Sequence, residues 1–273
     1  MILVNIGCGS MFHPAWVNLD SNPVDPAVRR WDVRRGLPFG DGEVDACYAS
    51  HVLEHLPRDR ALLLLAECRR ALRSGGILRL VVPDLEAIAR HYLRLLEEAD
   101  HGSRAAEADY DWVLLELFDQ MVRTDPGGAM HRYLTGGRVT NPQFVISRAG
   151  MDAERLILGH NSEPAKKTAS RPRLPYYWRR VAEEVVAKFS ALLLGQEAGD
   201  AMKEGLFRRS GQVHLWMYDR FSLRRLLEQV GFREVRRCEA NQSWIPDFTQ
   251  FELETLGGRV RKPDSLFVEG INS

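Results

Sequence analysis

Two glycines and an acid near the start of the chain could form a nucleotide-binding turn. The apolar segment 2–6 runs into Gly7-Cys8-Gly9, and a second short apolar segment ends at Asp20. Glycine allows a tight turn and lets a ligand approach the backbone. A carboxylate at the end of the next strand can accept hydrogen bonds from a ribose diol. The alternative is an ordinary turn without a ligand, with Asp20 ending its strand.

A second group of chemically capable residues follows the expected strand at 44–49. His51-Val-Leu-Glu54-His55 matches H-x-x-E-H, the inverted zinc-peptidase motif. Such a zinc site needs both histidines on one continuous helical face, and this motif lies at a strand-to-helix junction, so we predict no metal site. The strand end instead places Ser50 and His51 at the edge where open α/β sheets bind ligands. Alternatively, Glu54 and His55 cap and orient the helix start.

Further candidates for binding or proton transfer stand where other segments meet this edge. His214 opens the run that contains Trp216 and Tyr218, and a histidine on such a returning loop could act as a base. Asp84 follows the apolar segment 77–82 and is either a helix cap or a ligand for the substrate. Two weaker candidates lie in the middle of the chain, His131 and Tyr133.

The elements that must position these residues alternate between strand and helix patterns. Apolar residues at helical spacing over 59–72 end at Ser74-Gly75-Gly76, and a buried strand follows at 77–82. This order predicts an α/β fold with a mostly parallel sheet flanked by helices. The strand pattern vanishes over 100–212, which we interpret as a helical insertion, and resumes near the C-terminus. The predicted domains are a core of 1–99 with 213–273, and an insertion of 100–212.

Composition narrows the class of protein. Lys plus Arg equals Asp plus Glu at 37 each, so the net charge is zero, which argues against a general nucleic-acid binder. The four cysteines form no C-x-x-C motif and are expected to be reduced thiols of a cytoplasmic protein. No apolar run is long enough to span a bilayer. Because the first strand begins at residue 2, no signal peptide is expected.

One stretch of the insertion is basic. Lysines and arginines over 166–180 are interleaved with Tyr176, Tyr177 and Trp178, without an acid among them. The simpler interpretation is a solvated loop before a helix. The functional one is a clamp for a phosphate, a nucleotide-sugar or an anionic lipid headgroup, which would allow peripheral membrane contact. A homodimer is left open.

Several motifs together resemble the class I S-adenosylmethionine-dependent methyltransferases. Asn5 to Gly9 resembles their first motif, and Asp20 stands where their ribose-binding acid stands. Asp32 with Val33 resembles the segment that contacts adenine, residues 45–56 resemble the fourth strand and the helix start after it, and 72–78 resembles the turn into the fifth strand. The resemblance implies a Rossmann-like fold, S-adenosylmethionine as cofactor, and cofactor contacts from Asn5, Gly7, Cys8, Gly9, Asp20, Asp32, Val33 and Ser50.

The chain also departs from that family. Asn5 replaces a common acid, Met11 stands where a third glycine is frequent, and the first crossover between Gly9 and Asp20 is very short. The usual helix before the first strand is absent. We therefore expect the central insertion to supply the missing cover over the cofactor pocket.

The function implied is methyl transfer to a hydroxyl, or an amine, of a small-molecule, sugar or glycan-like acceptor, as in polysaccharide or natural-product biosynthesis. His51 or His214 would accept the proton, and Asp84, His131, Tyr133, Trp216 and Tyr218 would bind the acceptor. Two alternatives are a nicotinamide-dependent oxidoreductase, which would favour a full G-x-G-x-x-G, and a catalytically inactive cofactor-binding scaffold.

Overall fold

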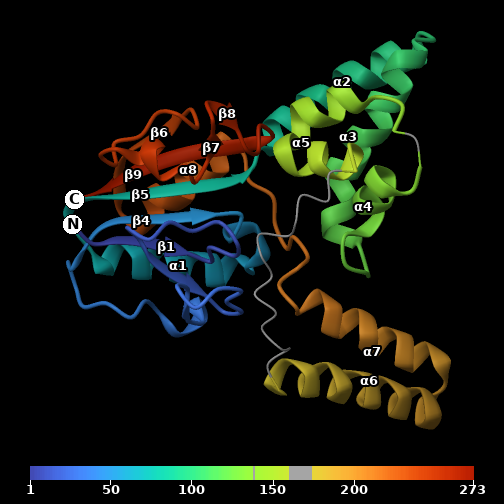
Figure 1. The fold of residues 1–273 in the computed structure, drawn as a ribbon, viewed down its shortest axis with the longest axis horizontal. Coiled ribbons are helices and arrows are strands. Elements are labelled where there is room, and N and C mark those ends of the chain that lie inside the picture. The colour runs from blue at the N-terminus through green and yellow to red at the C-terminus, as the bar shows by residue number, and fades with distance from the viewer. Residues whose placement is uncertain (138, 160–173) are drawn as a thin grey trace.

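The structure is a computed structural model that describes residues 1–137, 139–159 and 174–273, with the side chains of 174–183 left aside. A sheet with helices on one side forms one part of it, and helical segments form the other (Figure 1). The basic stretch 166–180 lies largely outside the described residues, and its side chains lie wholly outside them. Both interpretations of that stretch therefore stay predictions.

The sheet has seven strands in the order β3-β2-β1-β4-β5-β9-β6. The strands are β1 Leu3–Ile6, β2 Val17–Asp20, β3 Arg29–Arg30, β4 Val44–Ser50, β5 Leu72–Pro83, β6 Phe232–Cys238 and β9 Ser265–Asn272. Strands β1 to β5 run parallel, and β9 pairs antiparallel with both β5 and β6. The chain thus has the predicted α/β fold. The strand order reverses between β1 and β4, which is where doubly wound sheets bind their ligands.

One face of the sheet is covered by helices. These elements are α1 Arg58–Ala71, α8 Arg220–Val230 and the short 3₁₀ turns η1 Val33–Arg35 and η2 Leu53–His55. The apolar stripe of α1, with Leu65 fully buried, packs with Leu227 of α8 against Ile6 of β1 in one cluster. Asp219 caps α8 in a capping box with Ser222, so the helix begins where the chain returns to the sheet.

The opposite face is covered by irregular chain. Segment 239–264 contains η3 Phe248–Phe251 and the small hairpin of β7 Thr255–Leu256 and β8 Arg259–Val260. Phe248 and Trp16 meet edge to face, as do Phe248 and Tyr48 of β4. We expected the central insertion to supply the missing cover. On this face of the sheet, the cover comes from segment 239–264 together with the loop that carries Trp16.

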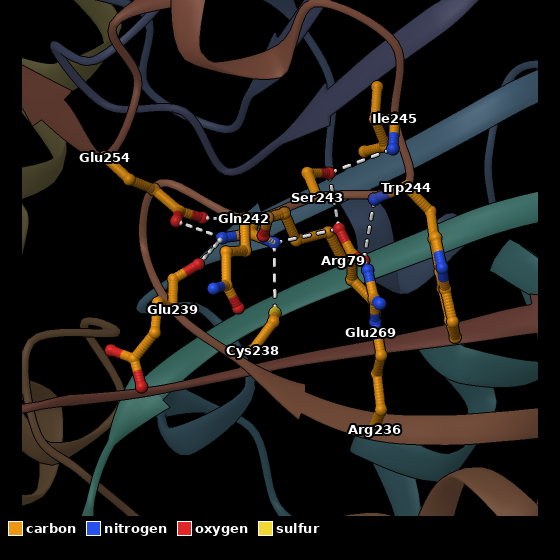
Figure 2. A network of polar contacts seen from close by, with 10 residues as sticks. All are labelled: Arg79, Arg236, Cys238, Glu239, Gln242, Ser243, Trp244, Ile245, Glu254 and Glu269. Carbon is orange, nitrogen blue, oxygen red and sulfur yellow. Dashed lines mark hydrogen bonds and ion pairs between the residues drawn. The ribbon is translucent and has the colours of Figure 1, made fainter.

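A buried ionic network fixes this segment to the sheet (Figure 2). Arg79 of β5 is fully buried and lies 2.5 Å from a carboxylate oxygen of Glu254 and 2.8 Å from one of Glu269. Its guanidinium also donates to the backbone carbonyls of Glu239 and Gln242. Because the five donors of arginine are spread over these acceptors, one guanidinium contacts both carboxylates, and Arg236 adds a second cation at Glu269.

Helices fill the described part of the chain between β5 and the return to the sheet. They are α2 Leu85–Asp100, α3 Arg104–Val122, α4 Gly128–Thr135, α5 Pro142–Ile157, α6 Leu174–Leu194 and α7 Gln196–Arg208. Helices α2 to α5 share their own core around Trp112, and α6 packs with α7 in a hairpin that Figure 1 draws apart from the sheet. Ile88 and Leu95 of α2 belong to that core, although we had placed residues 85–99 with the sheet. Among the helices that the structure describes, none combines the length and apolar character that a membrane crossing requires.

Candidate functional site

The glycine turn after β1 has the left-handed backbone that only glycine adopts freely. Gly7 has φ +64° and Gly9 has φ +54°. The two glycines serve different needs. A Cβ on Gly7 would lie 2.6 Å from Val52 Cγ2, so that position is filled by the protein itself. A Cβ on Gly9 would meet nothing within 4 Å, so the backbone at Gly9 faces open space where a ligand could approach.

Asp20 lies directly against this turn. One carboxylate oxygen accepts the Gly9 N–H at 2.9 Å, and the other accepts the Asn22 N–H at 2.7 Å. The residue is half-buried at the end of β2. A carboxylate can accept about four hydrogen bonds, so both oxygens keep capacity for a further donor. The structure therefore brings the predicted acid and the predicted turn together.

Asn5 lies just before the glycine turn, and Cys8 lies within it. The buried Asn5 amide donates to the Met11 carbonyl at 3.0 Å and to the Asn18 side chain at 3.1 Å, which holds the loop after the turn. We interpret Asn5 as a residue that positions the turn. Burial, and then the charge of Asp20, raise the pKa of the Cys8 thiol to about 12. Cys8 is therefore neutral at physiological pH and is no nucleophile.

Asp32 is engaged by an arginine. Arg34 Nη2 lies 2.7 Å and Nε 2.8 Å from the Asp32 carboxylate, which also accepts the Arg34 backbone N–H and caps η1. The hydrogen bonds from Arg34 lower the pKa of this carboxyl. A surface pair with a neighbouring arginine was the alternative to adenine binding. The adenine roles of Asp32 and Val33 stay predictions.

His51 stands at the carboxyl end of β4, one residue after Ser50, in an unusual backbone conformation. Its φ is +54°, a left-handed value that is uncommon outside glycine. The imidazole bridges two elements, since Nδ1 lies 3.0 Å from Glu54 Oε1 and Nε2 lies 3.1 Å from Ser265 Oγ at the start of β9. As expected, the H-x-x-E-H motif does not lie on a continuous helix, because η2 includes only its last residues.

Glu54 is the most buried acid of this region. It has no exposed surface, and neither carboxylate oxygen has an aligned hydrogen-bond partner among the described residues, His51 at 3.0 Å included. Burial would raise the pKa of this carboxyl, but His51, His55 and His214 outweigh burial and lower it to about 2. Glu54 is therefore an anion at physiological pH. Its backbone carbonyl accepts the N–H groups of Leu215 and Trp216, which ties η2 to the returning chain.

His55 and His214 meet beside this carboxylate. Their rings lie 4.7 Å apart, edge to face, and one ligand atom from each, with one from Glu54, all lie within 4.8 Å of one another. Burial lowers the pKa of His214 to about 3, so the imidazole is neutral. The sequence motif contains two members of this group. His214 could not be added from the sequence because it comes from the far side of the helical insertion.

Of the remaining residues predicted to bind the acceptor, some lie near the carboxyl edge of the sheet and the others lie in the helical insertion. Tyr218 has a buried hydroxyl without a hydrogen-bond partner in the described residues, and burial raises its pKa to about 12. Trp216 is 38% exposed and carries the Arg58 guanidinium 4.5 Å from its ring centre. Asp84 is a buried cap of α2 that accepts the Ala87 N–H, which is one of the two roles that the sequence left open for it.

Tyr133 and His131 belong to α4 instead. The Tyr133 hydroxyl donates to Asn141 at 2.7 Å and its ring packs on Trp112 in the core of the insertion, while His131 is exposed. Within the described chain, no hydrogen bond or ion pair joins either residue to His51 or Glu54. Their acceptor role stays a prediction that this geometry does not support.

Comparison with known proteins agrees with the fold and the turn. Residues 8–80 match the family model described as a methyltransferase domain. With the strand order above, this match agrees with the predicted resemblance of the N-terminal part of the chain to class I S-adenosylmethionine-dependent methyltransferases. The matched range includes Gly9, Asp20 and the H-x-x-E-H motif.

Two further comparisons add little. No curated protein matches the chain. Among solved structures, it is similar to one chain of the complex between the Haloferax volcanii Trm112 methyltransferase activator and a presumed methyltransferase, at 21% identity and a TM-score of 0.28. That alignment covers 36% of this chain and 50% of the other, so the chain spans about half the length of that relative. A likeness this distant carries no argument about activity.

Proposed function

We propose that this protein transfers a methyl group from S-adenosylmethionine to a hydroxyl group of a small-molecule or glycan-like acceptor. The observation that carries the proposal is the pairing of Asp20 with an open glycine turn. The Asp20 carboxylate lies 2.9 Å from the Gly9 N–H, and the space in front of Gly9 is free of protein atoms. These residues fit a cofactor that presents a ribose diol beside a chain that must pass close to the backbone.

The residues suited to hold the cofactor are therefore Asp20, at its ribose, and Gly9, at its methionine end. The bound cofactor supplies an activated methyl group. The protein has to align the acceptor with that methyl group, exclude water and remove one proton, because methyl transfer to a hydroxyl needs little covalent help.

His51 is the best-placed proton acceptor. Glu54 beside Nδ1 favours the tautomer with its proton on that atom, which puts the lone pair on Nε2. In this structure Nε2 lies 3.1 Å from Ser265 Oγ, so the acceptor hydroxyl would have to replace that contact to give up its proton there. The anionic Glu54 would then stabilise the imidazolium that forms. His214 is a poor base by comparison, since it is only 3% exposed and its pKa lies near 3. We therefore assign the proton to His51.

Two further features support parts of the proposal. The exposed Trp216 ring offers an apolar face of the kind on which a sugar ring stacks, close to the carboxyl edge of the sheet. The four cysteines are buried and unpaired, as a reducing cytoplasm would keep them.

The ribose contact is the direct test. Asp20→Ala should weaken binding of S-adenosylhomocysteine at least tenfold by calorimetry, because hydrogen bonds to a charged group contribute roughly 1.5–3 kcal/mol. Asp25→Ala is the matched control, since Asp25 accepts the Ala27 N–H away from the turn. Asp20→Asn would separate loss of the charge from loss of the Gly9 contact. Unchanged affinity in a folded Asp20→Ala protein would eliminate the ribose role.

A further inference from the structure

Glu54, His55 and His214 form a compact group, here called the Glu54 cluster, that no step of the proposed reaction uses as a whole. One potential ligand atom from each lies within 4.8 Å of the others. Glu54 and His214 are buried, and His55 is half-buried at the end of η2. The cluster thus combines nitrogen and oxygen donors from two separate segments at the carboxyl edge of the sheet.

The carboxylate of Glu54 is buried without a full set of hydrogen-bond donors. Glu54 has no exposed surface, and its one close polar neighbour is His51 Nδ1, 3.0 Å from Oε1, which makes no aligned hydrogen bond. Oε2 has no hydrogen-bond partner among the described residues, and proteins usually satisfy such a buried carboxylate oxygen by a donor or by a metal. Asp20, by contrast, uses both of its oxygens.

His55 is oriented as a metal ligand would be, and the segment that carries His214 is held in place by its backbone. His55 Nδ1 lies 3.1 Å from the Val213 carbonyl oxygen, so Nδ1 carries the proton and donates it. The lone pair then lies on Nε2, which leaves that atom free to bind. A histidine that gives its other N–H to a backbone carbonyl is the usual arrangement behind a metal-bound imidazole. The His214 backbone N–H donates to the Gln120 carbonyl at 2.8 Å, which fixes its segment against α3.

We propose that Glu54, His55 and His214 bind one divalent first-row transition-metal ion such as Zn²⁺. Two imidazoles with one carboxylate favour this class over Mg²⁺ or Ca²⁺, which prefer oxygen ligands alone. Three protein ligands leave one position open, as in catalytic zinc sites. A hydroxyl bound there would lose its proton more easily, and this last step rests on the proposed methyl transfer.

Two neighbouring groups bear on the charge of the site. His51 is the competing partner for Glu54, with Nδ1 at 3.0 Å from Oε1. The Arg123 guanidinium contributes to the lowered pKa values of His55 and His214, so it opposes a cation nearby. A carboxylate has about four acceptor sites, so contact with His51 leaves room for a metal ion on Glu54.

Metal binding can be measured without turnover. The full chain is treated with a chelator, dialysed, and titrated with Zn²⁺ by calorimetry and with Co²⁺ by visible absorption. We expect one ion per chain, and at least tenfold weaker binding in Glu54→Gln and in His214→Ala. His131→Ala is the control, because it removes an exposed histidine on α4 and should bind as the wild type does.

Circular dichroism checks the fold of each variant, and a thermal melt provides a second readout that needs only the wild type. Zn²⁺ should raise the melting temperature of the chelator-treated wild type, since an ion that binds only the folded chain stabilises it. The proposal would be overturned if the wild type bound no Zn²⁺ at a 100-fold excess of the ion. It would also be overturned if a folded Glu54→Gln protein bound Zn²⁺ as tightly as the wild type does, and His51 would then be the remaining partner of Glu54 in the wild type. Binding of S-adenosylhomocysteine, measured on the same samples, reports on the proposed function separately.

Discussion

Two of the places where this protein buries acids differ in how well the charge is satisfied. Glu254 and Glu269 share the guanidinium of Arg79, and Glu269 also accepts the backbone N–H of Trp244. Glu54 is buried as deeply, yet no aligned donor reaches it in the described part of the chain. The first group holds segment 239–264 on the sheet, as Figure 2 shows. The second stands at the carboxyl edge beside His51.

The difference helps to distinguish a buried charge that stabilises the fold from one that is available to bind a ligand. A fully paired buried network is rigid and has no capacity left for a ligand. An incompletely paired carboxylate keeps its acceptor sites available, at a cost in stability, and such groups collect where ligands bind. Removing charged side chains at each site in turn tests whether the two sites differ in this way.

The largest effect should come from the paired network. Arg79→Met would leave Glu254 without a cation and Glu269 with only the partly exposed Arg236, and we expect a loss of about 3–5 kcal/mol in the free energy of unfolding. Urea denaturation measures this loss directly. Arg236→Met is the control, because Arg236 contacts the same Glu269 from a partly exposed position and should cost about 1 kcal/mol. Similar losses in both variants would remove the distinction between the buried and the exposed arginine.

The next effect concerns activity at the incompletely paired site. His51→Ala should lower kcat at least about 100-fold, because a positioned base contributes that much to proton transfer, while cofactor affinity changes little. Steady-state kinetics with calorimetry separates the two quantities, and His101→Ala serves as control because His101 is an exposed histidine at the end of α2. If kcat is unchanged, no histidine base is needed, and an amine acceptor becomes the better hypothesis.

The paired network should also carry a pH signature. Burial raises the pKa of Glu254 to about 6 from its ordinary 4.5, so the folded chain binds this proton more tightly than the unfolded chain does. Its contribution to stability is therefore complete below pH 4.5 and is lost as the pH rises through 6, by up to about 2 kcal/mol. Glu254→Gln should flatten that part of the unfolding profile. An unchanged profile would mean that Arg79 neutralises Glu254 completely.

The smallest effect should come from neutralising Glu54. Glu54→Gln keeps the shape of the side chain and removes an anion that the folded chain favours through its one close neighbour His51, so in metal-free protein we expect a loss of about 1 kcal/mol in unfolding free energy. Glu269→Gln breaks a satisfied network and should cost more than about 2 kcal/mol. Equal losses in the two variants would show that Glu54 is paired as firmly as Glu269.

Local patterns were enough to predict the sheet and the turn. The apolar run of β1, the glycines after it and the acid at the end of β2 are close in sequence, so their meeting at Asp20 followed from strand geometry. The helical character of the insertion followed from periodicity in the same way. Where a neighbour offered a competing partner, as Arg34 does for Asp32, spacing alone could not decide between a ligand and a surface pair.

Contacts between distant segments could not be predicted. The cover over one sheet face comes from 239–264, and its anchor Arg79 reads in the sequence as one polar residue inside an apolar strand. The Glu54 cluster depends on His214, which is brought back across the whole insertion by the backbone bonds from Leu215 and Trp216 to Glu54. No periodicity or local spacing encodes that return.

The left-handed backbone at His51 implies a trade-off between the stability of the fold and the proposed catalysis. A residue with a Cβ gives up roughly 1 kcal/mol in that conformation, whereas glycine would adopt it freely. A laboratory selection for thermal stability alone would therefore favour glycine at this position. The selected protein would be more stable but would lack its proposed base.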